Sequence, residues 1–545
     1  MLKKILSILL ISVILIGTLA SCGDDDDISL VMPIPSDPMC IDPQIAETDV
    51  AKTIVLNCYE GLVRLDENYK VIPGVAESWT VSPDGLTYTF KLRSDTNWQL
   101  LKSYKDVLDD ENYMENFKTA VTAYDFEFAL KRAVDKITDS PDADKLYCIR
   151  NARLIHLGEA DKSSLGVKAT DATTLTITLE RANPDFLRIL TLPLCMPCNE
   201  EFFNATRAKY GLETKYTMCN GPFYIGRWTQ DHSVVMYRNE GYKGNGKVKP
   251  TAVYLNINKE EESVISKLKQ STYHCAFVSD SAHFSLSDNK KISNEVTVNS
   301  VTGLAFNCQN SILSNVNFRK ALAMLTDISI VSQPEGSTGN ANGIIPDCCR
   351  YSDSAYRQAA GAVKPLGYNE AAALELWNQG LKENELTAAT IKVLCTDEYA
   401  TQMQNVIQNW QRVLSTTIIA KVEVVSADEL SSAIKSDSYQ IAVTGITTKS
   451  STPTDTLEFF TTGNSKNIFN YADTDYDMII DSITTVVAGK DILFQTKMAE
   501  QNLINNAVFL PIHTYGDYFQ ISKDTEGIHC APAFEGVCFI NGGTD

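Results

Sequence analysis

The residues that most often carry out catalysis are scattered along this chain of 545 residues. The sequence contains no nucleophile elbow (G-x-S-x-G), no zinc-peptidase motif (H-E-x-x-H) and no phosphate-binding loop (G-x-x-x-x-G-K-[S/T]). Its six histidines are isolated, and the two nearest, His274 and His283, share no predicted helix. A triad assembled from distant segments remains an alternative. We predict a binding protein with no catalytic residues, no cofactor and no metal site.

Cys195 and Cys198 have the C-x-x-C spacing found in redox and metal-binding motifs. The pair ends an apolar run, and no second C-x-x-C completes a zinc site, so we interpret it as structural. The chain holds fourteen cysteines, with no spacing typical of a disulfide framework. Free thiols in an exported protein would suit a reducing habitat, because oxidising surroundings select against unpaired cysteine.

Residues 439–449 (YQIAVTGITTK) combine a short apolar run with a glycine and several polar residues. Residues 441–443 predict a buried strand, which delivers Thr447 and Lys449 to its carboxyl end. Ligands of open α/β sheets bind in the crevice beyond the carboxyl ends of the strands. Gly445 would let a ligand approach the main chain, since glycine has no Cβ. The alternative is an ordinary strand followed by a solvated loop.

Hydrophobic periodicity predicts a mixture of strands and helices around these residues. Residues 86–93 alternate apolar and polar side chains after a Pro-Asp-Gly turn, which predicts a half-buried strand. Residues 165–179 predict a hairpin of two such strands, and residues 122–134 predict a helix capped by Thr122. Together these segments indicate a small α+β unit within a mixed α/β protein.

The N-terminus has the composition of an export signal. Lys3 and Lys4 precede a strongly apolar run, and small residues lead into Cys22. This ending resembles a bacterial lipobox, which implies that residues 1–21 are a lipoprotein signal peptide and that Cys22 is lipidated. Residues 22–27 would then be the lipidated cysteine and an acidic tether. The alternative is a transmembrane anchor, but the apolar stretch is short for one.

The charge balance is strongly acidic, with 48 Lys and Arg against 68 Asp and Glu and a formal net charge of −20. That sign argues against nucleic acid or an anionic lipid surface as a partner. The chain is too long for one hydrophobic core, so we expect two or three domains. No later apolar run reaches membrane-spanning length, so the lipid anchor is the only membrane contact that we expect.

Several longer motifs follow one another along the mature chain, at residues 73–79 (PGVAESW), 121–126 (VTAYDF), 219–223 (CNGPF), 238–242 (RNEGY), 304–307 (LAFN), 317–322 (NFRKAL) and 467–471 (NIFNY). In this order they resemble the motifs of family 5 extracellular solute-binding proteins. The similarity is greatest to the oligopeptide-binding lipoprotein receptors of ABC importers, and it covers nearly the whole mature chain.

The resemblance implies an α/β fold of a particular architecture. It would be a two-lobed, type II clamshell like that of periplasmic binding proteins, with an additional α+β domain. Lobe I would consist of residues 28–60, 186–300 and 515–545. The additional domain would be residues 61–185, and lobe II would be residues 301–514. The ligand would be enclosed between the two lobes.

The resemblance also implies where a peptide would bind. In the family's oligopeptide receptors, the peptide backbone pairs with the protein in the manner of a β-strand. Backbone pairing gives affinity with little side-chain specificity, because every peptide offers the same amide groups. The residues at the matching positions are Gly445, Ile446 and Thr447, with Pro35, Ser36 and Asn307 across the cleft. Aromatic residues that could also line the cleft, although such residues more often belong to the core, are Tyr147, Trp228, Phe306 and Tyr471.

Two positions depart from the family pattern. The family has an aromatic residue directly after this glycine, and a few positions later an acidic residue that pairs with the peptide's α-ammonium. Ile446 and Lys449 stand there instead. In a closed cleft, Lys449 would repel an ammonium and attract a carboxylate, phosphate or sulfate group. Asp455 is a nearby acid in a different register, and the alternative for Lys449 is a solvated loop lysine.

We therefore expect a lipid-anchored, extracytoplasmic substrate-binding protein of an ABC transporter, which captures oligopeptides between two lobes for import. The expected partners are a peptide or other small solute and the transporter's permease and ATPase. The receptor itself would be a monomer held on the bacterial cell membrane. The alternatives are a receptor for a non-peptide or anionic solute, and a surface sensory or interaction lipoprotein that kept the fold without transport.

Overall fold

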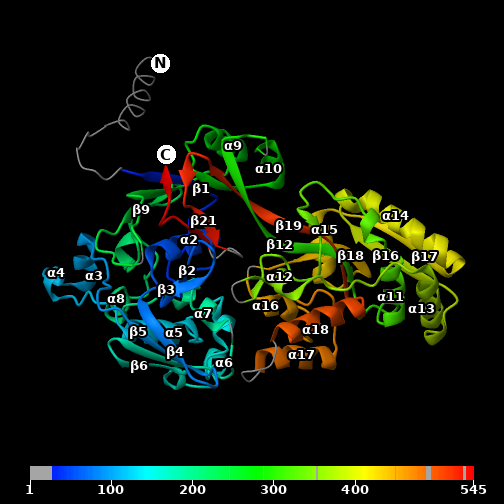
Figure 1. Ribbon diagram of the computed structural model, residues 1–545, viewed down its shortest axis with the longest axis horizontal. Helices are drawn as coiled ribbons and strands as arrows, with labels where there is room; N and C mark the ends of the chain where they lie inside the picture. The colour runs from blue at the N-terminus through cyan, green and yellow to red at the C-terminus, as the bar shows by residue number, and fades with distance from the viewer. Residues whose placement is uncertain are drawn as a thin grey trace, which may run out of the picture.

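The computed structural model describes residues 27–544, with gaps at residues 184, 245, 287, 352–353, 449, 486–491 and 532–535. The expected signal peptide, the lipidation residue Cys22 and Lys449 lie outside the described residues. Figure 1 shows two lobes side by side, one drawn in blue to green and the other in yellow to orange. Among the described helices, none is long and apolar enough to cross a membrane.

The first lobe is built on a four-stranded sheet with the strand order β1-β10-β9-β8. Strands β1 and β10 are parallel, and the other pairs are antiparallel. The strands are β8 (Phe223–Thr229), β9 (Ser233–Arg238), β10 (Ala252–Ile257) and β1 (Ser29–Ile34). The helices that follow in this half of the chain include α2 (Asp49–Cys58), α7 (Phe186–Ile189), α8 (Glu200–Ala205), α9 (Glu261–Lys269) and α10 (Asp280–Leu286).

A second four-stranded sheet, entirely antiparallel, has the order β4-β5-β7-β6. Its strands are β4 (Ala76–Val81), β5 (Thr87–Leu92), β6 (Val167–Asp171) and β7 (Thr174–Thr178). Helix α5 (Ala123–Ala133) packs against it and begins with the predicted cap, because the Asp125 carboxylate accepts from the Thr122 amide at 2.7 Å. The predicted strand, hairpin and capped helix are therefore confirmed.

A larger sheet has the strand order β11-β19-β12-β18-β16-β17. Its strands are β11 (Cys275–Val278), β12 (Ile292–Phe306), β16 (Ala389–Cys395), β17 (Ile418–Val424), β18 (Ile441–Thr447) and β19 (Phe509–Ser522). Around its second half lie α11 (Val316–Met324), α13 (Glu370–Glu383), α14 (Asp397–Leu414), α15 (Ala427–Lys435), α16 (Pro453–Glu458), α17 (Thr474–Thr485) and α18 (Ile492–Asn505).

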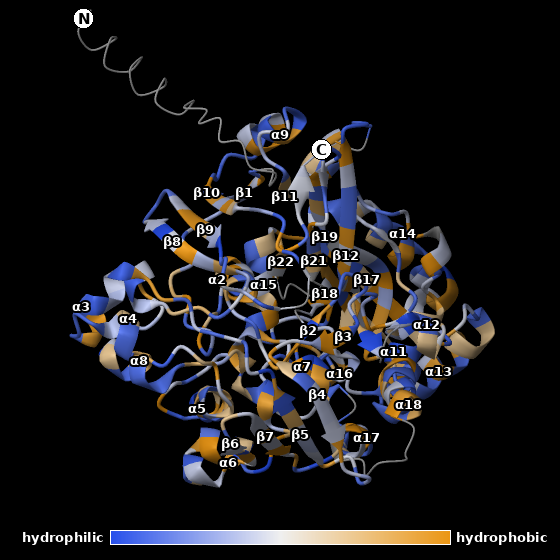
Figure 2. Cartoon of the chain, turned by 60° about the vertical axis from the view of Figure 1, so that its left-hand side comes forward, coloured by the Kyte–Doolittle hydropathy of each residue, from blue (hydrophilic) through white to orange (hydrophobic). Residues whose placement is uncertain are grey.

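The two longest strands, β12 and β19, belong to both lobes. At one end β19 pairs with β11, which contacts β1 of the first lobe. At the other end β12 pairs with β18 in the second lobe. Between these ends the β12–β19 register shifts twice, at Val298/Ser300 and at Thr302/Gly303. Figures 1 and 2 show this strand pair running between the lobes, with hydrophilic and hydrophobic residues along it.

The buried cores divide along the same line. One cluster combines the β1 sheet with the β4 sheet, joining side chains such as Leu30 and Phe90. The two main clusters of the second lobe are centred on Trp377 with Trp410 and on Phe460. The boundary that we place between residues 185 and 186 is therefore not marked by a break in the core, and the domain limits remain a proposal.

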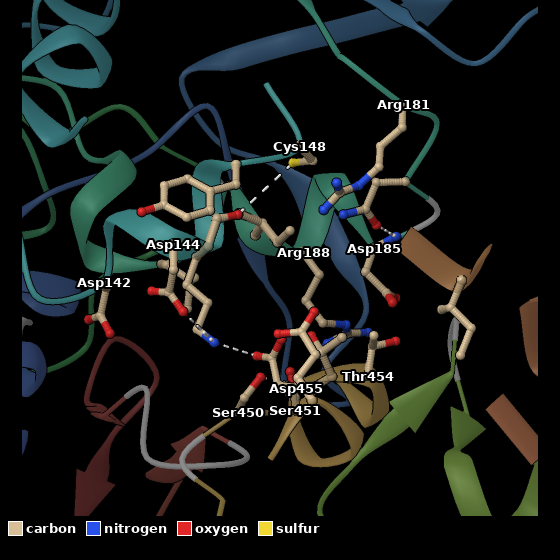
Figure 3. Close-up of a pocket in the computed structure, with 18 of the residues that line it drawn as sticks. Asp142, Asp144, Cys148, Arg181, Asp185, Arg188, Ser450, Ser451, Thr454 and Asp455 are labelled. Carbon is tan, nitrogen blue, oxygen red and sulfur yellow. Dashed lines mark hydrogen bonds and ion pairs between the residues drawn. The ribbon is translucent and has the colours of Figure 1, made fainter. Parts of the chain in front are cut away.

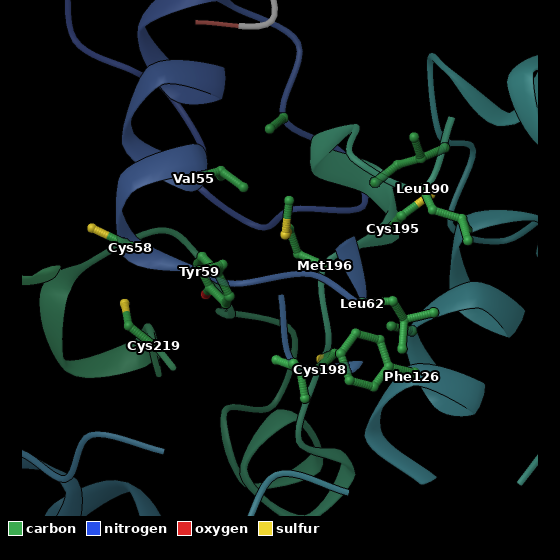
Figure 4. Close-up of a cluster of buried hydrophobic side chains, with 14 of the residues drawn as sticks. Val55, Cys58, Tyr59, Leu62, Phe126, Leu190, Cys195, Met196, Cys198 and Cys219 are labelled. Carbon is green, nitrogen blue, oxygen red and sulfur yellow. The ribbon is translucent and has the colours of Figure 1, made fainter. Parts of the chain in front are cut away.

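Sulfur-containing side chains contribute to the first of these cores, as Figure 4 shows for Cys58, Cys219 and Met196. All thirteen described cysteines are free thiols, and ten of them are buried. Within the C-x-x-C segment, the Cys198 sulfur lies 3.4 Å from the Arg132 guanidinium, whereas Cys195 contacts the Ile189 carbonyl. The two sulfurs thus have separate packing partners, which supports the structural interpretation of the pair.

Replacing Gly303 by alanine should destabilise the strand pair that joins the lobes. A Cβ at this position would collide with the Leu510 carbonyl oxygen of β19. We expect a loss of about 1 to 3 kcal/mol, seen as a lower melting temperature in differential scanning fluorimetry. Gly367→Ala is the matched control, because a Cβ there meets nothing within 4 Å. Equal melting temperatures for the two variants would contradict the claim that close packing at Gly303 stabilises the β12–β19 pair.

Thiol titration checks the state of the cysteines. We expect the chain from Asp24 onward, unfolded in guanidinium without reductant, to release thirteen equivalents of thiol. The native protein should react slowly with only a minority of them, because burial raises the pKa of thiols such as Cys195 and Cys275 and the thiolate is the reactive form. A markedly lower count in the unfolded protein would reveal disulfides instead.

Candidate functional site

Strand β18 contains the predicted peptide-binding residues and lies in the interior of the large sheet. It is antiparallel to β12 and parallel to β16, so its carboxyl end points toward the first lobe's side of the sheet. Ile446 is buried and Thr447 is exposed, with its hydroxyl 3.0 Å from that of Ser300. Packing within the sheet explains why residue 445 is a glycine, because a Cβ there would lie 2.7 Å from the Val301 carbonyl oxygen.

Of the other predicted binding residues, Asn307 does not lie at this end of the strand. Asn307 follows β12 at the opposite end of β18, roughly 20 Å away along the strand. Its side-chain amide nitrogen donates to the Tyr439 carbonyl at 3.0 Å. Pro35 and Ser36 follow β1 and are exposed. The structure therefore gives Asn307 a role in holding the loop before β18, and the binding role of Pro35 and Ser36 stays a prediction.

A partly open cavity lies between the lobes, just beyond the segment that follows β18. Its volume is about 380 Å³, within the range of small-molecule and peptide sites. We call it the interlobe cavity (Figure 3). The charged residues that line it come from both halves of the chain and are Lys52, Asp142, Asp144, Lys145, Arg181, Asp185, Arg188, Asp455 and Glu458. Ser450 and Ser451 line it directly after the β18 segment.

One ion pair crosses this cavity from lobe to lobe. The Lys145 ammonium lies 2.6 Å from the Asp455 carboxylate of α16 and 3.6 Å from that of Asp144 (Figure 3). Their side chains are about one-fifth exposed, 23% for Lys145 and 19% for Asp455, so solvent screens the pair less than it would at the surface. A second pair, Lys52 with Asp142 at 2.9 Å, lies within the first lobe.

Two cavity carboxylates have no hydrogen bond or ion pair within the part of the chain that the structure describes. They belong to Asp185, which precedes α7, and to Glu458, which ends α16. Burial raises the pKa of Asp185 to about 6, and burial together with the nearby Asp455 charge raises the pKa of Glu458 to about 7. Both groups therefore bind a proton more readily than a solvated carboxylate does.

A second, more open cavity of about 710 Å³ continues from the first. We call it the outer groove. It shares Tyr147, Arg181, Glu458 and Asn464 with the interlobe cavity. These four residues therefore stand where the two spaces meet. A linear ligand held in the interlobe cavity could extend past them into the groove.

The sequence pointed to only part of this site. Tyr147 and Asp455, both named as possible cleft residues, do line the interlobe cavity. Phe306 and Tyr471 are buried in the cores instead. Asp185 and Glu458 were not anticipated, because they are far apart in the chain. The one available signal was that each acid follows a proline within five residues, and proline is common at helix starts.

The arrangement offers binding chemistry. In the described residues there is no group of three or more metal-ligating side chains. What the cavity presents is a set of charged and hydroxyl groups drawn from both lobes. Such a site can recognise a polar, charged ligand by hydrogen bonds and ion pairs.

The comparisons with known proteins agree with this architecture. The chain is 27% identical over 505 residues to the dipeptide-binding protein DppE of Bacillus subtilis, covering 90% of this chain and 88% of that protein. It is 24% identical to the oligopeptide-binding protein OppA of the same species, with coverages of 92% and 90%. It also shares 36% identity over 213 residues, 38% of this chain and 36% of the other, with the probable deoxycholate-binding periplasmic protein YgiS of Escherichia coli.

Solved structures show the same fold. HbpA2 from Haemophilus parasuis superposes with a TM-score of 0.74 at 19% identity, covering 95% of this chain and all of that one. Listeria monocytogenes OppA bound to peptide superposes with a TM-score of 0.66 at 21% identity, with coverages of 95% and 99%. The expected two-lobed clamshell is therefore confirmed.

The family itself follows from a match over most of the chain. Residues 70–467 match the family described as bacterial extracellular solute-binding proteins, family 5 middle. Its members are solute-binding receptors, which confirms the interpretation as a binding protein and not an enzyme. The chain belongs to family 5 of the bacterial extracellular solute-binding proteins.

Proposed function

We propose that this protein is a lipid-anchored receptor that captures peptides between its two lobes and delivers them to the permease and ATPase of an ABC importer. The observation that carries the proposal is the interlobe cavity, whose charged lining comes from both lobes. Relatives that align over nearly the whole chain are named for dipeptide and oligopeptide binding. Cys22 is the proposed lipidation residue, and the receptor acts as a monomer outside the cytoplasm.

Closure of the lobes couples ligand binding to delivery in this proposal. The hinge is the β12–β19 pair, whose register shifts lie at residues 298–303. A ligand that contacts both lobes favours the closed arrangement, because those contacts exist only when the lobes are together. We place the lobe boundaries at these strands, with residues 301–514 as lobe II. Residues 28–60, 186–300 and 515–545 then form lobe I, joined to the additional domain.

The peptide in this proposal lies in the interlobe cavity and the outer groove. The segment after β18 that contains Ser450 and Ser451 forms one wall, and the short helical turn that contains Lys145 forms the other. Cavity side chains would supplement the backbone pairing that was expected at Gly445 and Ile446. Lys449 belongs to the same segment, next to Ser450, and its proposed role is to contact a carboxylate of the ligand.

A receptor for an anionic, non-peptide solute is the second candidate. It is favoured by the 36% identity with the protein named for deoxycholate binding, although that match covers only 38% of this chain. The cavity lining argues against it, because five carboxylates face four basic groups there. Introducing an anion into such a site costs more than introducing a group that is neutral or positive.

Ligand release from the purified protein tests the proposal. We expect native mass spectrometry of the chain from Asp24 onward to show bound peptides, which denaturation sets free. A mixture of two- to five-residue peptides should raise the melting temperature, since saturation at one hundred times the dissociation constant adds about 2.7 kcal/mol. Failure of every peptide, together with a shift caused by deoxycholate, would favour the anionic solute instead.

The pH dependence of stability tests the charge state of the empty cavity. The pKa of Glu458 is raised from 4.5 to about 7. Its contribution to the folded state is therefore retained at low pH and lost as the pH rises from about 4.5 to about 7. Glu458→Gln removes this loss, so the variant should be more stable than the wild type at pH 8, by at most about 3 kcal/mol, and nearly equal at pH 4.5.

Differential scanning fluorimetry without ligand, at both pH values, makes this measurement. The exposed Glu375 of α13 provides a matched control in the same lobe, because Glu375→Gln removes the same charge outside the cavity. A Glu458→Gln variant that is less stable than the wild type at pH 8 would show that the carboxylate has a partner and would contradict the assignment.

A further inference from the structure

We propose that Asp185 and Glu458, together with Asp455, form a subsite for a positively charged side chain, so that the preferred peptides contain lysine or arginine. This inference rests on the proposed function and names its substrate class. It concerns carboxylates contributed by both lobes, and so the cation would add to the contacts that hold the lobes together.

The three carboxylates converge on one region of the cavity. Asp455 and Glu458 stand one helical turn apart in α16, so their side chains leave the same face of the helix. Asp185 approaches from the first lobe, where it precedes α7 and does not cap that helix with its side chain. The Asp455 charge acts on both Asp185 and Glu458, raising the pKa of each.

The basic groups of the cavity do not neutralise these carboxylates fully. Lys145 contacts Asp455 and Asp144, and Lys52 pairs with Asp142. Arg188 donates to the Tyr69 carbonyl at 3.2 Å, and its charge lowers the pKa of Asp185, but by less than burial raises it. Lys145 and Arg181 lower the pKa of Glu458, but burial and the charges of Asp455 and Asp144 raise it by more.

A buried carboxylate without a partner is unfavourable, and near neutral pH a proton partly relieves that cost. A ligand cation would do so more effectively, because it also forms a charge-assisted hydrogen bond. The site therefore gains more from a lysine or arginine side chain than from an apolar one of the same length.

The position of Glu458 favours a side chain over a peptide terminus as the cation. Glu458 lines both the interlobe cavity and the outer groove. A peptide that occupies both spaces passes this residue with an internal part of its backbone. What it can present there is a side chain, whereas its α-ammonium lies at one end.

Two series of pentapeptides test the inference by isothermal titration calorimetry. In an all-alanine background, lysine is moved through the five positions in one series and norleucine in the other. Norleucine has the same carbon chain as lysine and lacks only the ammonium. For the wild-type protein we expect the tightest lysine peptide to bind at least tenfold more tightly than the tightest norleucine peptide. A third series with glutamate should bind most weakly.

Two cavity variants and one control complete the test. The Glu458→Gln and Asp185→Asn variants should each bind norleucine peptides, and their preference for lysine over norleucine peptides should fall below threefold. Glu375→Gln on the exposed face of α13 should leave the preference unchanged. Equal binding of lysine and norleucine peptides, or tighter binding of glutamate peptides, overturns this inference and leaves the peptide receptor standing. If no peptide in any series binds, the proposed function fails and this inference fails with it.

Discussion

The antiparallel pairing of β12 and β19 is the interaction on which the two-lobed arrangement depends. Strands of this length, Ile292–Phe306 and Phe509–Ser522, contribute to the sheet of one lobe and also contact the other. Backbone hydrogen bonds hold the pair firmly along its length, while the two register shifts interrupt the ladder in the middle. This arrangement suits the hinge motion that we propose, in which the lobes move relative to each other without separating.

The carboxylates of the interlobe cavity that could bind a ligand cation also destabilise the folded protein when no ligand is bound. Asp185 and Glu458 are partly buried, and the nearby basic groups do not fully offset the free-energy cost of burying these carboxylates. The Lys145–Asp455 pair offsets part of the cost by joining the lobes directly. A ligand that supplies the missing charge would recover the remainder. Part of the affinity would therefore come from ion pairs between a ligand cation and cavity carboxylates that the protein's own basic groups do not fully neutralise.

Local patterns predicted much of the fold, because alternation and capping depend on neighbouring residues. The strand predicted from alternation at Thr87–Leu92, the helix capped at Thr122 and the strand predicted from the apolar run of β18 are all present. The site was less accessible from sequence. Asp185 and Glu458 meet only through tertiary folding.

Residues chosen by resemblance can also have purely structural partners. Asn307 donates to the Tyr439 carbonyl, and Gly445 fits closely beside Val301 of the neighbouring strand.

Hydrogen–deuterium exchange with and without a bound peptide tests the capture of ligand between the lobes most directly. We expect slower exchange in residues 142–148, 181–188 and 450–458 at once, because the ligand contacts both walls of the cavity. Protection confined to one wall, or found only around Pro35 and Ser36, would contradict the account.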